Sequence, residues 1–157
     1  MKQNRRTLIT AAVAATVAGA LPLSAFAQKK IVVGFSQIGA ESEWRTANTN
    51  SMKSAATAAG IELKFSDAQQ KQENQIKAIR SFIAQKVDVI AFAPVVASGW
   101  DTVLKEAKAA KIPVILTDRS VDSKDESLYL SFLGSDFTEE GRKAGRWLLE
   151  KTKGAQG

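Results

Sequence analysis

The stretch Ile31-Val32-Val33-Gly34-Phe35-Ser36 decides the fold class, because an unbroken apolar run is typical of a strand that is buried on both faces of a sheet. Three later runs are also rich in apolar and β-branched residues, and their starts follow at intervals of 30, 26 and 25 residues. This spacing accommodates a strand, a loop and a helix in each unit. The later runs are IELKFS at 61–66, VDVIAFA at 87–93 and IPVILT at 112–117, and a fifth strand is expected at 128–133.

The segments between these runs have the periodicity and the capping residues of helices. We expect helices over 44–59, around 76–83, from 98 onward, and from 136 to about 151. Ser98-x-x-Asp101 and Asp136-x-x-Glu139 predict capping boxes at the last two helix starts, and Gly60 suits the end of the first. Right-handed crossovers between such units give an α/β fold, three-layer αβα with a mainly parallel sheet.

The composition excludes several classes of chemistry. The 157 residues include no cysteine and no histidine, so disulfides, Cys/His zinc sites, Ser-His-Asp triads and imidazole acid–base catalysis are all excluded. No glycine-rich dinucleotide turn, phosphate loop or nucleophile elbow follows any predicted strand. We therefore expect no cofactor and no metal, and ligand binding or carboxylate chemistry remains open.

The N-terminus has the features of an export signal. Lys2, Arg5 and Arg6 precede an apolar run over 8–23, and Ala25-Phe26-Ala27 has the small-x-small pattern of a cleavage site. A membrane anchor is the alternative, but the run falls short of the about 20 apolar residues that a spanning helix needs. Without residues 1–27 the net charge falls from +6 to +3, which is too weak and dispersed for nucleic-acid binding. The sequence therefore predicts a signal peptide over residues 1–27.

The loops after the strands hold the candidate site, because ligands of open parallel sheets bind beyond the carboxyl ends of the strands. Glu41, Trp44 and Arg45 follow the first strand, and Asp118 and Arg119 end the fourth. Carboxylates and guanidinium groups are planar forks that hydrogen-bond two adjacent hydroxyls at once, so they suit a polyhydroxylated ligand. The indole of Trp44 offers an apolar face for a sugar ring.

Simpler interpretations of these residues stay open. Asp118 and Arg119 could form a local ion pair, and Glu41 could serve only to favour a helix N-terminus. Asp67 is expected to cap a loop or a helix start, and Trp100 is expected in the core.

At these same loops the chain resembles a known family. The runs VGFSQIGAESEWRTANTNS (33–51), DAQQKQENQIKAIRSFIAQKVD (67–88), APVVASGW (93–100) and IPVILTDRSVD (112–122) are similar to the N-terminal lobe of type I periplasmic sugar-binding proteins, the solute receptors of ABC importers. Within that family the resemblance is to the galactofuranose-binding branch. It implies a sugar closed between two lobes.

The resemblance assigns roles and boundaries. It implies that Glu41, Arg45, Asp118 and Arg119 bind the sugar hydroxyls, whereas Trp44 and Ser36 line the wall of the first lobe. This lobe would span 28–134, and 135–157 would be the opening helix of a second lobe absent from the chain. We therefore expect a fragment of a longer receptor. The implied partners are a monosaccharide and a permease in the inner membrane, for a monomer in the periplasm.

Two other classes of function are alternatives to ligand binding for import. The same fold serves as the effector domain of lactose-repressor-like transcription factors, but a DNA-binding helix-turn-helix should then precede residue 30, where the sequence has an export signal. A carbohydrate-active enzyme would use a carboxylate pair such as Glu41 and Asp118. Neither class is favoured over binding.

Overall fold

A computed structural model describes residues 29–153, and the predicted signal peptide lies outside the described residues. The described chain contains one sheet of five strands in the order β2-β1-β3-β4-β5, and every pairing is parallel. This confirms the predicted α/β class. The strands are β1 (Val32–Gln37), β2 (Glu62–Asp67), β3 (Val89–Phe92), β4 (Val114–Asp118) and β5 (Ser131–Gly134).

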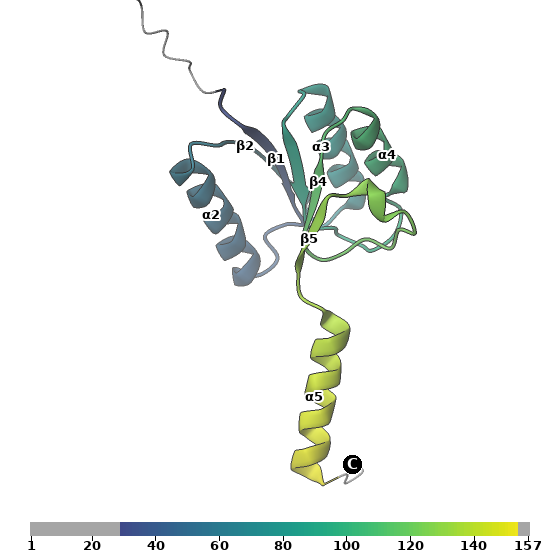
Figure 1. The fold of residues 1–157 in the computed structure, drawn as a ribbon. Helices are drawn as coiled ribbons and strands as arrows, with labels where there is room; N and C mark the ends of the chain where they lie inside the picture. Colours follow the sequence, from purple (N-terminus) through teal and green to yellow (C-terminus); the bar gives the residue numbers. More distant parts are fainter. Residues whose placement is uncertain (1–28, 154–157) are drawn as a thin grey trace, which may run out of the picture.

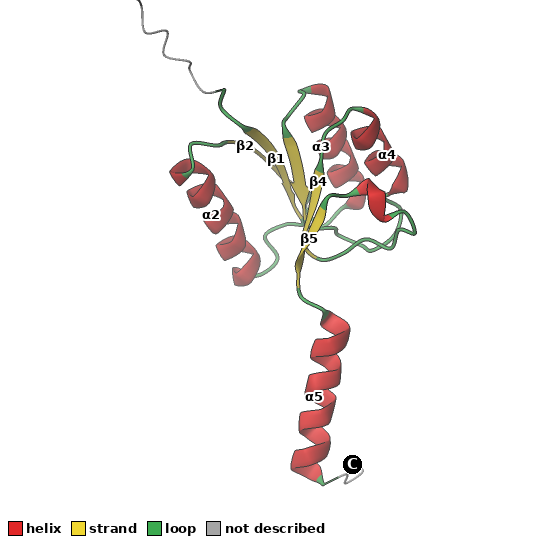
Figure 2. Cartoon of the chain, viewed as in Figure 1, coloured by secondary structure: helices red, strands yellow, loops and turns green. Residues whose placement is uncertain are grey.

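Four α-helices alternate with the strands (Figures 1 and 2). α3 and α4 cover one face of the sheet and α2 lies on the other, which gives the predicted three layers. α5 stands apart from the sheet, and none of its residues is buried. The helices are α2 (Glu43–Ala58), α3 (Gln72–Ala84), α4 (Asp101–Ala109) and α5 (Phe137–Thr152), with a short 3₁₀ turn at Glu126–Leu128.

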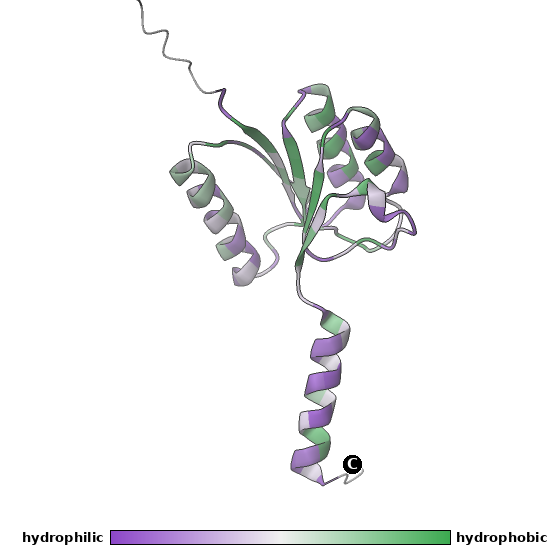
Figure 3. Ribbon diagram, in the orientation of Figure 1, coloured by the Kyte–Doolittle hydropathy of each residue, from purple (hydrophilic) through white to green (hydrophobic). Residues whose placement is uncertain are grey.

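The hydrophobic core lies between the sheet and the helix pair α3–α4. Hydrophobic residues concentrate on the strands and on the sides of these two helices that face them (Figure 3). Gly34 permits close packing here, since a Cβ at this position would lie 2.5 Å from the ring of Phe82. Trp100 is 1% exposed and its ring centroid lies 4.9 Å from that of Phe92, so its predicted place in the core is confirmed.

The opposite face of the sheet has a lighter cover. Phe35 and Phe65 pair there, with ring centroids 6.2 Å apart, and Lys53 of α2 places its ammonium 4.4 Å from the Phe65 ring centroid. Only Arg45 and Ala56 of α2 are buried. This helix is therefore held with much less apolar contact than α3 and α4.

The predicted helix ends are partly confirmed. Asp136 caps α5 by accepting a 2.9 Å hydrogen bond from the Glu139 amide, and Gly60 follows α2 with the left-handed φ of +67° that favours glycine. The capping box expected at Ser98 is wrong, because α4 begins at Asp101 with Trp100 as its N-cap. The Trp100 indole donates to the Val96 carbonyl at 2.7 Å, so burial of the indole fixes this helix start.

Candidate ligand-binding site

The candidate site lies at the carboxyl edge of the sheet, where β1 leads into α2 and where β4 ends. The Ser42 hydroxyl accepts a 3.2 Å hydrogen bond from the Arg45 amide and caps the N-terminus of α2. This cap fixes the first turn of α2, which carries Trp44 and Arg45. The helix start is therefore the element that presents both side chains to the edge.

The Arg45 guanidinium connects the loop after β1 with the end of β4. Its side chain is only 5% exposed, and its Nη1 donates to Asp118 Oδ2 at 2.9 Å while its Nε donates to Glu41 Oε1 at 3.1 Å. Three of the predicted residues therefore meet at one point. Arg45 and Asp118 are in direct contact although 73 positions separate them in the sequence. The strands that carry them are not neighbours, since β3 lies between β1 and β4. The long side chain of Arg45 spans this gap.

Asp118 holds an unusual backbone conformation at the end of β4. Its φ of +64° lies in the left-handed region, which is uncommon for residues other than glycine and is best tolerated by Asp and Asn. Arg119 follows and is more exposed than Asp118. Its Nε lies 3.8 Å from Asp118 Oδ2, and its Nη1 donates to the Val95 carbonyl at 3.4 Å. The bend leaves Arg119 at the rim of the same edge.

Trp44 supplies an open apolar surface beside these charges. The residue is 55% exposed, and the Arg45 Cζ lies 4.7 Å from the centroid of its ring. A hollow of about 260 Å³ lies next to it, between α2 and the ends of β4 and β5. Its lining comprises Trp44, Asn48, Met52, Thr117, Asp118, Leu133, Gly134 and Ser135.

The structure does not bring Ser36 into this cluster. The residue is fully buried, and its hydroxyl has no hydrogen-bond partner among the described residues. Successive strand residues point to opposite faces, so Ser36 shares the side of Gly34 and Phe82, away from α2. The other five predicted residues lie together at the edge.

Gln37, the last residue of β1, is a site residue that the sequence analysis missed. Its side chain is fully buried and hydrogen-bonds Arg45, Asn48 and the amide of Ile38. The available signal was a polar residue that ends an otherwise apolar strand, but such a residue is equally common in an exposed loop.

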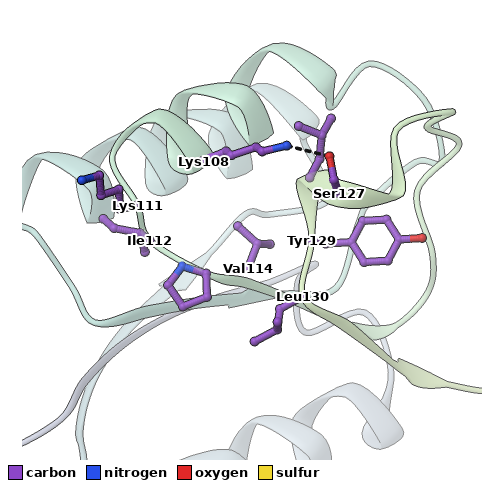
Figure 4. A pocket seen from close by; sticks show the side chains of 9 residues that line it. Lys108, Lys111, Ile112, Val114, Ser127, Tyr129 and Leu130 are labelled. Atoms are coloured by element: carbon purple, nitrogen blue, oxygen red, sulfur yellow. Dashed lines mark hydrogen bonds between the residues drawn. The ribbon is translucent and has the colours of Figure 1, made fainter.

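Other parts of the described chain offer less. A second hollow of about 290 Å³ opens near the amino ends of β4 and β5, where Lys108 donates to the Ser127 hydroxyl at 2.6 Å (Figure 4). Within residues 29–153 no group of three or more acidic residues is arranged to hold a metal ion. None of the described helices has the length and apolar character needed to cross a membrane.

The family model and the similar proteins of known function all point to the same protein family. The model for the periplasmic binding protein domain matches residues 33–157. The galactofuranose-binding protein YtfQ of Escherichia coli (strain K12) is 54% identical over 150 residues, which cover 96% of this chain and 46% of that protein. The fructose import binding protein FruE of Bifidobacterium longum (strain NCC 2705) is 42% identical over 97 residues, which cover 61% of this chain and 30% of that protein.

Solved structures of similar proteins share the fold. The binding protein of the arabinose ABC transporter from Shewanella sp. ANA-3, bound to L-arabinofuranose, is 61% identical and matches with a TM-score of 0.74 over 78% of this chain and 40% of its own. A Mycobacterium smegmatis protein in complex with β-D-fucofuranose is also 61% identical, with a TM-score of 0.76 over 81% and 42% of the two chains. The chain spans about half the length, or less, of the relatives it matches. On the matched residues and the shared fold, the chain belongs to the periplasmic binding protein family.

Proposed function

We propose that this chain forms one lobe of a receptor that binds a monosaccharide and delivers it to an ABC importer. The observation that carries the proposal is the set of charged forks at the sheet edge, with Arg45 held between Glu41 and Asp118 and the open indole of Trp44 beside them. Charged forks hydrogen-bond adjacent hydroxyls, and the indole packs against the apolar face of a sugar ring. Three similar proteins are described with galactofuranose, L-arabinofuranose and β-D-fucofuranose, which supports a furanose of galactose or a related aldose as the ligand here.

The residues take distinct roles in this proposal. Glu41, Arg45, Asp118 and Arg119 bind hydroxyls, and Trp44 forms the wall. Each well-made hydrogen bond to a charged group contributes on the order of 1.5–3 kcal/mol. Ser36 is fully buried on the face of β1 that points away from α2, so the proposal gives it no contact with the sugar.

The rest of the chain follows the same proposal. Residues 1–27 would direct export to the periplasm, 28–134 form the first lobe, and 135–157 open a second lobe. The exposure of Trp147, Leu148 and Leu149 on α5, at 59%, 55% and 63%, supports packing of this helix against further protein. The partner is a permease in the inner membrane, and the receptor acts as a monomer.

Ligand-observed NMR tests the binding function directly. Saturation-transfer experiments with D-galactose and L-arabinose distinguish the ring forms, because furanose and pyranose anomeric protons have separate signals. We expect transfer to the furanose signals. Trp44→Ala should weaken binding about twofold to tenfold, the equivalent of an aromatic contact of about 0.5–1.5 kcal/mol.

The control variant is Trp147→Ala, since Trp147 is similarly exposed but lies on α5, away from the site. It should bind as the unmodified protein does. Absence of transfer to either sugar at millimolar concentration would refute the proposal. Hydrolysis of 4-nitrophenyl β-D-galactofuranoside would instead favour the enzyme alternative, in which Glu41 and Asp118 act as the carboxylate pair.

A further inference from the structure

Gln37 has a side chain whose hydrogen-bonding capacity is completely used. Its Nε2 donates to Asn48 Oδ1 at 2.8 Å and to Thr49 Oγ1 at 3.2 Å. Its Oε1 accepts from the Ile38 amide at 3.0 Å and from Arg45 Nη1 at 3.3 Å. An amide group offers two donors and one oxygen with two lone pairs, so these four bonds fix which way the group is turned.

The same amide ties three parts of the fold together. Asn48 and Thr49 lie on the second turn of α2, Arg45 lies on its first turn, and Gln37 itself ends β1. A buried polar group that loses its partner carries a desolvation penalty, so each of these bonds resists movement of α2 along the sheet edge. Gln37 thereby links the position of the helix to the position of the guanidinium.

Arg45 is supported from three sides as a result. Glu41 binds its Nε and Asp118 binds its Nη1, and Gln37 is the neutral group of the three. Among the described residues, Nη2 of Arg45 has no hydrogen-bond partner. A guanidinium is rigid and planar, so holding Nε and Nη1 also determines the place of Nη2.

We propose that Gln37 is a positioning residue for ligand binding: it orients Arg45 so that Nη2 is presented to a sugar hydroxyl. This inference rests on the proposed sugar-binding function. Gln37 is fully buried and acts through Arg45, without contact to the ligand.

Gln75 provides a matched control. It is also fully buried, and its Nε2 donates to the Ala93 and Ser36 carbonyls at 2.7 and 3.5 Å while its Oε1 accepts from the Val95 amide at 2.9 Å. None of these partners is a charged side chain of the site. Gln75→Met therefore removes buried hydrogen bonds of the same kind without touching Arg45.

The test follows the Arg45 Nε–H signal in the ¹⁵N-labelled full chain, with the signal assigned by its disappearance in Arg45→Lys. We expect exchange of this proton with water to accelerate at least tenfold in Gln37→Met and to stay unchanged in Gln75→Met. Gln37→Glu should restore slow exchange, because the new carboxylate keeps the acceptor for Arg45 and for the Ile38 amide. All variants are compared at a temperature at which circular dichroism shows each of them folded. A general loss of stability would accelerate exchange in Gln75→Met as well, so the difference between Gln37→Met and Gln75→Met isolates the contact to Arg45.

Sugar titration of the same samples completes the test. Gln37→Met should weaken sugar binding by about tenfold relative to Gln75→Met, and Gln37→Glu should recover part of this loss. Unchanged exchange in Gln37→Met, or equal acceleration in Gln75→Met, would overturn the positioning role. Faster exchange with unchanged sugar affinity would overturn its link to the ligand. If the unmodified chain binds no sugar while exchange responds as expected, the proposed function fails and the orienting contact to Arg45 stands.

Discussion

Replacing Asp118 by asparagine should destabilise the protein by about 2 kcal/mol, the middle of the range for a hydrogen bond to a charged group. The structure supports this value in two ways. The Arg45 side chain is 5% exposed, so loss of the 2.9 Å contact leaves a nearly buried cation with less compensation. Glu41 and Gln37 remain bound to it, and the effect therefore stays below the about 3–5 kcal/mol expected when a fully buried ion pair is broken.

The asparagine substitution isolates the charge because Asn tolerates the left-handed φ of +64° as well as Asp does. Asp118→Ala should lower the free energy of unfolding by about 1 kcal/mol more than Asp118→Asn, because alanine is strained in this left-handed conformation. Arg119→Gln is the control: its guanidinium lies 3.8 Å from the same carboxylate and its side chain is 48% exposed, so the loss should stay below about 1 kcal/mol.

The assay is urea unfolding at pH 7, followed by circular dichroism, with the free energy of unfolding extrapolated to water. The slope with urea should be the same in all variants, which would show that the unfolded states are comparable. An Asp118→Asn protein within about 0.5 kcal/mol of the unmodified protein would place this contact among exposed ion pairs of little energetic value. It would refute the reasoning that Arg45 is a buried charge that depends on Asp118.

Further predictions concern other parts of the fold. Gly34→Ala should destabilise by about 1–3 kcal/mol in the same assay, because the added methyl group would meet the Phe82 ring at 2.5 Å; an unchanged midpoint would contradict this packing. A hydrogen bond from Lys29 lowers the pKa of Asp88, so its contribution to stability is full above the ordinary carboxyl range and is lost as the pH falls through the lowered pKa. Between pH 7 and pH 3 the thermal midpoint should therefore fall less in Asp88→Asn than in the unmodified protein, and equal falls would remove Asp88 as a cause. Asp136→Ala should reduce the helical chemical shifts of α5, whose cap it removes, while the urea midpoint stays unchanged because α5 buries no residue; a lowered midpoint would show that α5 contributes to the core.

The sequence predicted the strands well because their apolar runs leave few alternatives. All five strands and four helices appear at the expected places, with ends that differ by a few residues. The predicted start of α4 was wrong. The local pattern Ser98-x-x-Asp101 favoured a start at Ser98, but burial of Trp100 places the start at Asp101. Tertiary packing determined the outcome, and no local pattern reports it.

The candidate site was predictable in its charged residues and not in its geometry. The meeting of Arg45 with Asp118 depends on strand order, which spacing along the chain does not give. The choice between Ser36 and Gln37 depends on which face α2 covers, because one strand residue points toward this helix and the next points away. The crossover connections decide which face of the sheet α2 covers. The role of a polar residue at the end of β1 therefore cannot be assigned until the fold is known.

The two faces of the sheet are packed unequally by helices, and this affects how substitutions can accumulate around the site during evolution. α2 carries Trp44 and Arg45, but only Arg45 and Ala56 of this helix are buried. Elements with few apolar contacts open locally at low free energy and leave the remainder intact. If the proposed function holds, substitutions on α2 can therefore change the ligand specificity while the apolar layer beneath α3 and α4 keeps the protein folded. Specificity and stability would then depend on opposite faces of one sheet.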